Sequence, residues 1–428
     1  RAAFTSMFYT LLTGPFTSCV LLLRVFFPHL ATKLLVRARS LVVKPLPTKI
    51  NFNAEEGEGG YSVAEMANVV ATIMKFTGTV HHFPKLQYMI AHGATSSNNP
   101  YKNAYGCGAC SGKAGIPNSQ IFCGMANNVK VRNELRASHQ IDIPSTTFFV
   151  SCYHDTSTDE ILCFNEAEAP VELRGDLTRI LMQLRNAAQK NSLERCRHFA
   201  AGRSMMNEKI TFQHVLNRGA NLAEPRPEYG HTNNALCVIG RRELTKKLYL
   251  DRRSFLTSYD AKSDPEGIVL AQVMAGAVPV AGGINLDYYF SRVDNETYGS
   301  GTKLPLNVAA LLGVMTGSQS DLRIGLAGQM VELHEPVRIT ILIEADPAII
   351  EGILQKAPRQ LRLVKNSWVH MAAIHPKTGE FFLYENGGFR PYIPAVNKLI
   401  KINDMRGYVA HQKGPLPFGH LEKVDGQS

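Results

Sequence analysis

Long apolar runs, short buried segments and polar loops follow one another along this chain. Residues 7–27 form an apolar run about as long as a membrane-spanning helix, although Gly14 and Pro15 should break the helix and Arg24 is charged. Residues 29–44 are basic and amphipathic, a pattern typical of helices that lie on an anionic membrane surface.

The central part of the chain alternates between strand and helix patterns. After an acidic, glycine-rich segment, Ser62 and Glu65 form the capping-box pattern that predicts a helix over residues 64–76. Buried strands are predicted over residues 86–91 and 146–153, with a helix over about residues 119–137 between them, and a third strand is predicted over residues 160–164.

This order predicts an α/β fold with a mainly parallel sheet flanked by helices and with helical additions. Residues 172–219 predict a basic helical region, and from about 235 to 350 short apolar runs alternate with glycine-rich turns. We see no linker after residue 62. We therefore predict a helical segment over residues 1–62 and one compact α/β unit over residues 63–428.

Charge is concentrated at the start of the chain. The 428 residues carry a net charge of +10, and residues 1–50 hold seven Lys and Arg but no Asp or Glu. A nucleic-acid surface would spread basic charge more widely, so we expect no nucleic-acid partner.

Residues 1–62 are predicted to contact a membrane or a membrane partner. The alternatives are a buried helix pair with a solvated basic face and a true membrane span. No basic segment precedes the apolar run as in a signal peptide.

Candidate metal chemistry gathers between residues 86 and 113. His92 ends a buried strand, and a polar loop then brings Cys107 and Cys110. An imidazole facing thiolates is typical of a zinc site, but a strand-capping His beside a buried thiol is an equally ordinary pattern. The Cys107–Cys110 pair could also be redox-active. Eight cysteines without a secretory signal favour a reducing compartment, where paired cysteines serve more often as metal ligands than as disulfides.

Other polar groups offer weaker candidates. His154, Asp155 and Asp159 follow the second strand and could supply acid/base groups or ligands, or simply form a polar turn. The glycine-rich sequence around Cys107 imitates a phosphate loop, but Ala114 follows Lys113 where that loop needs Ser or Thr. No GxSxG motif supports serine hydrolase chemistry.

Several strings in order resemble the DabA family, the peripheral subunits of two-component bacterial inorganic carbon transporters. They run from about residue 86 to 390 and are AHGATSSNNPYKNAYGCGACSG, FFVSCYHDTSTDEI, RPEYG, RRSFLTSYD, GGINLDYYFSRVDNETYGSGTK, NVAALLGVMTGSQSDLRIGL and HEPVRI. The resemblance implies a core similar to β-carbonic anhydrases, with Zn²⁺ held by two Cys, one His and one Asp. Of these ligands, the His and the second Cys fall on His92 and Cys107, which leaves Cys110 to pack the loop.

The other two ligands are implied by a Cys-x-Asp-x-Arg motif far upstream in the family. None of the cysteines here is followed two residues later by Asp, and the chain begins with Arg1. We therefore expect the N-terminal half of a longer protein to be missing, so that this chain holds half of a zinc site and is inactive alone.

The implied function is uptake of inorganic carbon at the cytoplasmic face of the cell inner membrane. Zinc acidifies water so that hydroxide attacks CO2 at neutral pH and yields bicarbonate. The resemblance implies that an integral, antiporter-like membrane subunit (DabB-like) couples this step to the proton gradient, so enzymatic hydration is expected only with that partner. The alternatives are an inactive carbonic anhydrase-like scaffold and a soluble CxxC redox protein.

Overall fold

The computed structural model describes most of the chain. The described residues are 2–42, 60–95, 113–199, 202, 207–221, 234–294, 297–298, 315–316, 321–322, 336–395, 398–410 and 415–422.

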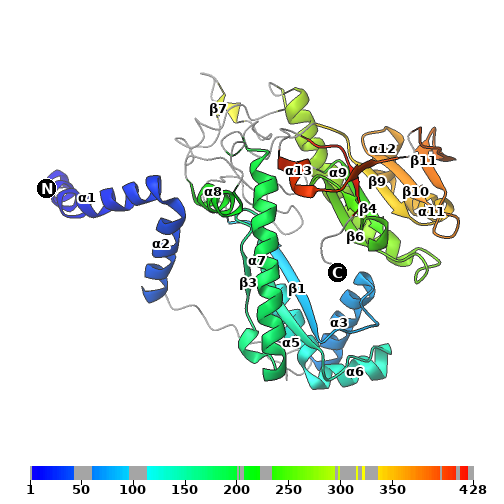
Figure 1. Ribbon diagram of the computed structural model, residues 1–428, viewed down its shortest axis with the longest axis horizontal. Helices are drawn as coiled ribbons and strands as arrows, with labels where there is room; N and C mark the ends of the chain where they lie inside the picture. Colours follow the sequence, from blue (N-terminus) through cyan, green and yellow to red (C-terminus); the bar gives the residue numbers. More distant parts are fainter. Residues whose placement is uncertain are drawn as a thin grey trace.

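Two helices, α1 (Ala2–Phe26) and α2 (Pro28–Val42), form an arm that extends from the rest of the molecule (Figure 1). The expected break at Gly14 and Pro15 is wrong, because α1 continues through Pro15. A proline removes one backbone hydrogen bond, which a long apolar helix can absorb. The helix ends instead just before Pro28, which starts α2.

A three-stranded sheet lies at the centre of the molecule, in the order β1–β2–β3. Its strands are β1 (Leu86–Gly93), β2 (Phe148–Asp155) and β3 (Ile161–Cys163). The first two are parallel, as predicted, and β3 is antiparallel to β2. Side chains alternate across β2: Phe149 packs in one cluster with α3, α5 and α6, and Val150 packs in another with α7. Helices therefore cover both faces of this sheet.

Three short helices build the first of these layers: α3 (Val63–Thr77), α5 (Ile116–Asn127) and α6 (Val129–His139). The predicted capping box is confirmed, with Ser62 and Glu65 bonded to each other's backbone at the start of α3. The single helix predicted over residues 119–137 is wrong. Asn128 adopts an extended conformation and its side chain accepts a hydrogen bond from Lys130 N at 2.9 Å, which starts a second helix.

The basic region becomes two helices, α7 (Arg174–Cys196) and α8 (Glu208–Ala220), preceded by the 3₁₀ turns η2 (Glu166–Glu168) and η3 (Val171–Leu173). Helix α7 is long and packs along the three-stranded sheet and against α8 (Figure 1).

A second sheet of six strands has the order β12–β11–β10–β9–β4–β6. Its strands are β4 (Leu236–Gly240), β6 (Ser254–Ser258), β9 (Thr340–Glu344), β10 (His370–Ile374), β11 (Phe381–Glu385) and β12 (Gly388–Pro391). The four neighbouring strands β10, β9, β4 and β6 are mutually parallel, whereas β11 pairs antiparallel with both β10 and β12. At the carboxyl edge of this sheet, Arg241 follows β4 and Glu344 ends β9. The backbone N and the guanidinium of Arg241 both donate hydrogen bonds to the Glu344 carboxylate.

Three helices pack on one face of this sheet: α9 (Ile268–Val293), α11 (Pro347–Lys356) and α12 (Pro358–Lys365). The longest of the apolar runs predicted between residues 235 and 350, with the glycines inside it, is α9, a single helix of 26 residues. Its residues Leu270, Met274 and Val278 are fully buried against the sheet, so burial outweighs the low helix propensity of its glycines.

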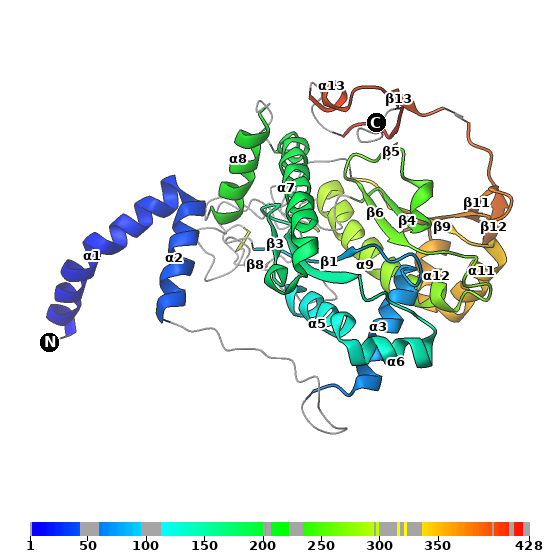
Figure 2. The same cartoon turned by 60° about the horizontal axis from the view of Figure 1, so that its bottom comes forward.

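Short elements complete the described part of the chain. They are η5 (Arg242–Leu244), β5 (Leu248–Tyr249), β7 (Met315–Thr316), β8 (Asp321–Leu322), β13 (Ile400–Ile402), α13 (Met405–Ala410) and β14 (Gly419–Leu421). The order β13–β14–β5 makes a small third sheet beside the six-stranded one (Figure 2). The fold is α/β as predicted, with several mixed sheets. The division at residue 62 stays a prediction.

Candidate metal centre

The parallel pairing of β1 with β2 brings the predicted polar residues to one edge. His92 lies directly opposite His154, and Gly93 lies opposite Asp155. Because both strands are parallel, both end at the same edge, where ligands of such sheets bind. The structure therefore places His92 and the polar residues after β2 next to each other, as the sequence predicts.

Residues 155–160, which we call the acidic turn, reverse the chain between β2 and β3. Asp155 N donates to Glu160 O at 2.9 Å and Asp159 N donates to Asp155 O at 2.8 Å. The Asp155 carboxylate also accepts hydrogen bonds from Ser157 and from the backbone and hydroxyl of Thr95. The turn is thus tied to the residues that follow β1.

A buried ion pair lies beneath the turn. Asp159 Oδ2 accepts from Arg195 on α7 at 3.1 Å, and both side chains are 0% exposed. The other carboxylate oxygen of Asp159 lies 3.1 Å from His154 Nε2. The result is a chain of groups, Arg195–Asp159–His154, that ends beside His92.

The electrostatics favour a neutral imidazole at His92. Although this side chain reaches the surface, the surrounding protein limits its hydration, and that desolvation lowers the pKa of His92; His154 lowers it further. Neutral imidazole is the form that binds a metal ion. For Asp159, burial alone would raise the pKa, but Arg195 and the hydrogen bond from His154 hold the pKa of this carboxyl well below its usual range.

The described residues contain only part of the predicted metal site. Cys107 and Cys110 lie outside the described residues. Within the described residues, no group of three or more His, Cys, Asp and Glu is arranged to hold a metal ion. His92 is therefore the described part of the predicted zinc site, and the assignment of Cys107 stays a prediction.

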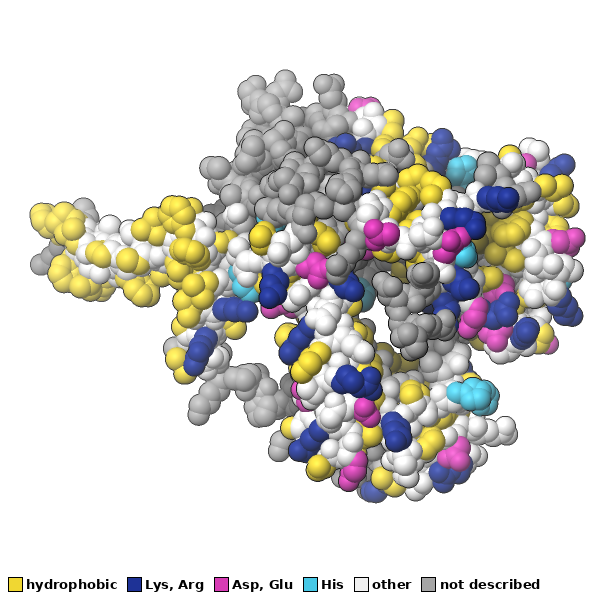
Figure 3. Space-filling view, in the orientation of Figure 1, with side chains coloured by type: hydrophobic (Ala, Val, Ile, Leu, Met, Phe, Trp, Pro, Cys, Tyr) yellow, Lys and Arg dark blue, Asp and Glu magenta, His cyan; other side chains and the backbone are white. Residues whose placement is uncertain are grey.

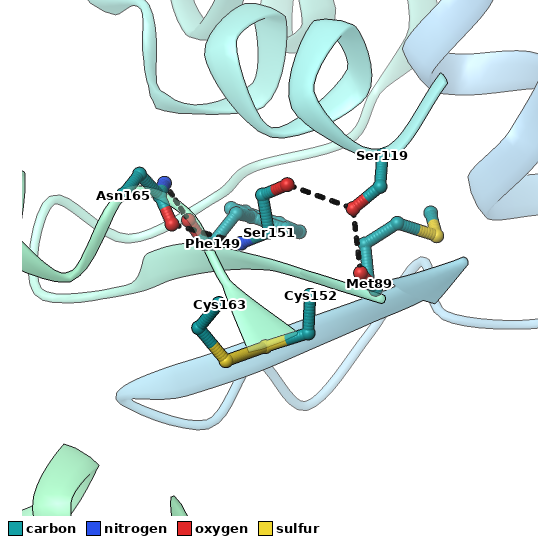
Figure 4. Close-up of a disulfide and its surroundings, with 7 residues drawn as sticks. All are labelled: Met89, Ser119, Phe149, Ser151, Cys152, Cys163 and Asn165. Atoms are coloured by element: carbon teal, nitrogen blue, oxygen red, sulfur yellow. Dashed lines mark hydrogen bonds between the residues drawn. A yellow bond between two sulfur atoms is a disulfide. The ribbon is translucent and has the colours of Figure 1, made fainter. Parts of the chain in front are cut away.

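A disulfide joins β2 to β3 within the same unit (Figure 4). Cys152 and Cys163 are direct partners in the antiparallel register, with their Cα atoms 4.2 Å apart. The expectation that paired cysteines here serve as metal ligands is wrong for this pair. Asn165, just beyond β3, bonds both Ser151 N and Phe149 O, so the end of this hairpin is fixed to the core (Figure 4).

Sequence reasoning missed Arg195. It is fully buried, yet it lies in a basic helical region where most arginines reach solvent. Asp159 neutralises this buried charge, which would otherwise be costly to remove from water. The one available signal was Asp159 itself, an acid in the turn between two predicted strands.

The comparisons with known proteins cover nearly the whole chain. The family model described as "Probable inorganic carbon transporter subunit DabA" matches residues 1–369. The chain belongs to the DabA family. It is 41% identical over 410 residues to a probable inorganic carbon transporter subunit DabA 2 of Sorangium cellulosum, covering 94% of this chain and 40% of that protein.

Other DabA relatives match to a similar extent. The chain is 40% identical over 358 residues to the DabA subunit of Azotobacter vinelandii, covering 84% of this chain and 42% of that protein. It is 36% identical over 422 residues to a probable inorganic carbon transporter subunit DabA 2 of Rhodopirellula baltica, covering 97% of this chain and 39% of that protein. The chain thus spans about two fifths of the length of these relatives. No solved structure matches it.

Proposed function

We propose that this chain is part of a zinc-binding subunit that hydrates CO2 to bicarbonate in one direction, in an energy-coupled inorganic carbon uptake complex. The observation that carries the proposal is the position of His92 at the carboxyl end of β1, opposite His154, in a member of the DabA family. The names of its relatives support transport of inorganic carbon. We also propose that the core around β1–β3 is related to β-carbonic anhydrases.

In this proposal, His92 and Cys107 hold Zn²⁺ together with two ligands from outside this chain. A neutral imidazole at a strand end suits the metal, which supplies a Lewis acid that acidifies water. Hydration also releases a proton. Because His154 Nε2 is bonded to Asp159, its Nδ1 is the atom left to accept that proton, and Asp159 holds the ring in place.

Metal content tests this proposal. The chain, purified together with the portion that its longer relatives carry, should bind about one zinc per copy, and His92→Ala or Cys107→Ser should release it, since each removes one of four ligands. Cys110→Ser is the matched control and should retain zinc. Full zinc in the first two variants, or loss only in the control, would refute the ligand assignment. A reversible Cys107–Cys110 disulfide without metal would instead favour a redox protein.

We further propose that the arm, residues 2–42, docks the protein on an antiporter-like (DabB-like) membrane subunit, at the cytoplasmic face of the inner membrane. Apolar side chains cover α1 (Figure 3), and Phe8, Leu12 and Phe16 are each more than 60% exposed. Residues Phe4–Phe26 are long and apolar enough to cross a membrane, and none of that stretch is buried. Ile268–Phe290 passes the same test, but α9 packs against the six-stranded sheet.

Fractionation tests this part of the proposal. With the partner co-expressed, Phe16→Glu should move the protein from the membrane fraction to the soluble fraction, because a charge is costly in an apolar contact. Ile393→Glu, at a side chain that is 88% exposed outside the arm, is the control and should leave the distribution unchanged. Without the partner the unmodified protein should be soluble. If its extraction requires detergent, it is an integral protein and the peripheral assignment fails.

A further inference from the structure

The arm that we propose as a docking element is connected to the acidic turn by direct packing. Helix α2 packs against α8, and both views place α8 beside α7 (Figures 1 and 2). Although most of the arm is exposed, Ala31 on α2 is 0% exposed. Lys33 Nζ also lies 3.9 Å from Glu160 Oε1, in the acidic turn. The arm therefore touches the turn through one ion pair and lies against the helix behind it.

The C-terminal end of α8 abuts the acidic turn itself. At Gly219 there is almost no space: an added Cβ would lie 3.0 Å from Thr158 Cγ2 and 3.7 Å from Ser157 O. Thr158 is buried and Ser157 is fully buried, so the turn cannot move outward into solvent without breaking this contact. Glycine at position 219 is what allows α8 to approach so closely.

The turn behaves as one body because its own hydrogen bonds close it. Its backbone is bonded to itself at both ends, and Arg195 donates to both Ser157 O, at 3.3 Å, and the Asp159 carboxylate. A displacement of Thr158 by α8 would therefore move Asp159 as well, and Asp159 binds His154 beside His92. Tightly packed elements transmit such displacements rather than absorbing them.

We propose that α8 is a positioning element that couples the arm to the candidate metal centre through the contacts α2–α8 and Gly219–Thr158. Docking on the membrane partner would shift α2, α8 and the acidic turn together, and so set the position of His154. The inference rests on the proposed function only in taking the arm as the docking element. The coupling itself can be measured without zinc or a partner.

Hydrogen exchange of the 428-residue chain, read by mass spectrometry, tests the coupling. The variant Ala31→Trp inserts a large side chain at a fully buried position of α2. We expect peptides covering residues 155–160 to exchange about tenfold faster, since coupled sites share their opening equilibria. Leu34→Trp adds the same ring at a 48% exposed position of the same helix and should leave the turn unchanged.

A pair of glycine variants tests the second contact. Gly219→Ala should accelerate exchange of the turn by about three- to tenfold, because the new Cβ crowds Thr158. Gly175→Ala, on α7, has no atom within 4 Å of the new Cβ and should have no such effect. Peptides covering β9 and β10 should exchange at the normal rate in every variant.

The outcomes are distinct. Unchanged exchange of the acidic turn in Ala31→Trp overturns the proposal, whether or not α2 itself exchanges faster. If Ala31→Trp also accelerates exchange of the β9 and β10 peptides, it has unfolded the chain, and Gly219→Ala, which perturbs the contact of α8 with Thr158, decides instead. An unchanged turn in that variant also overturns the coupling. Absence of zinc would refute the proposed chemistry while leaving these rates unaffected.

Discussion

Replacing Asp159 by asparagine should strongly loosen the acidic turn. The Asp159–Arg195 pair is completely buried, with 3.1 Å between its charged atoms. Asn keeps the shape of the side chain but leaves the Arg195 guanidinium without its carboxylate, away from water. Removing one partner of a buried pair costs about 3–5 kcal/mol. Because Arg195 keeps its bond to Ser157 O, we expect the lower end, about 3 kcal/mol.

Hydrogen exchange of the peptides that cover residues 148–163 measures this loss locally. Each 1.4 kcal/mol corresponds to a factor of ten, so exchange in Asp159→Asn should be about a hundredfold faster than in the unmodified chain at pH 7. Asp176→Asn is the matched control. Asp176 pairs with Arg179 at 2.9 Å, but both side chains are at least half exposed, so exchange should change by about twofold or less.

The pH dependence of the exchange rates gives the result that would refute this reasoning. The pKa of Asp159 is lower in the folded chain than in the unfolded chain, where it is about 3.9. The ionised carboxylate therefore stabilises the fold above that value, and the stabilisation is lost as pH falls toward the folded pKa. The ratio of exchange rates between variant and unmodified chain should shrink below about pH 4. A ratio under about threefold at pH 7, or one that stays constant on acidification, would show that the ion pair does not stabilise the turn.

Three further predictions concern other parts of the fold. Gly240→Ala should lower the melting temperature, because its Cβ would lie 2.9 Å from a side-chain carbon of the neighbouring strand, whereas Gly352→Ala, which has open space, should be neutral or stabilising. Ser62→Ala should cost about 1 kcal/mol of stability, measured by urea titration of the α3 region, because it removes the capping box. At pH 8 an alkylating reagent should modify the exposed Cys19 but not Cys123, since burial raises the pKa of that thiol to about 12; rapid modification of Cys123 in the folded chain would contradict its burial.

Local sequence patterns predicted the parts of this protein whose causes are local. The capping box at Ser62 and the apolar runs of β1 and β2 each depend on a few neighbouring residues, and all three were confirmed. Parallel pairing followed from the strand, helix, strand order, which by itself predicts that His92 and His154 lie at the same edge of the sheet. Family membership was also recoverable, because it rests on ordered strings of residues.

Where the local signal was ambiguous, packing decided the structure. The glycines of α9 suggested turns, but burial of Leu270 and Met274 against the six-stranded sheet keeps the segment helical. Pro15 suggested a break, yet α1 continues through it. Conversely, Asn128 interrupts a stretch that looked like one helix, because its side chain caps the helix that follows.

The sequence by itself determined the strand, helix, strand order around β1 and β2, the concentration of positive charge in residues 1–50 and the edge at which the candidate metal centre lies. Only the tertiary structure decided which side chains meet there. Asp159 and Arg195 are 36 positions apart, and Gly219 approaches Thr158 from a separate helix. Backbone conformation follows from short-range sterics and hydrogen bonding, whereas neutralisation of a buried charge and close packing of two elements depend on residues that only the complete fold brings together.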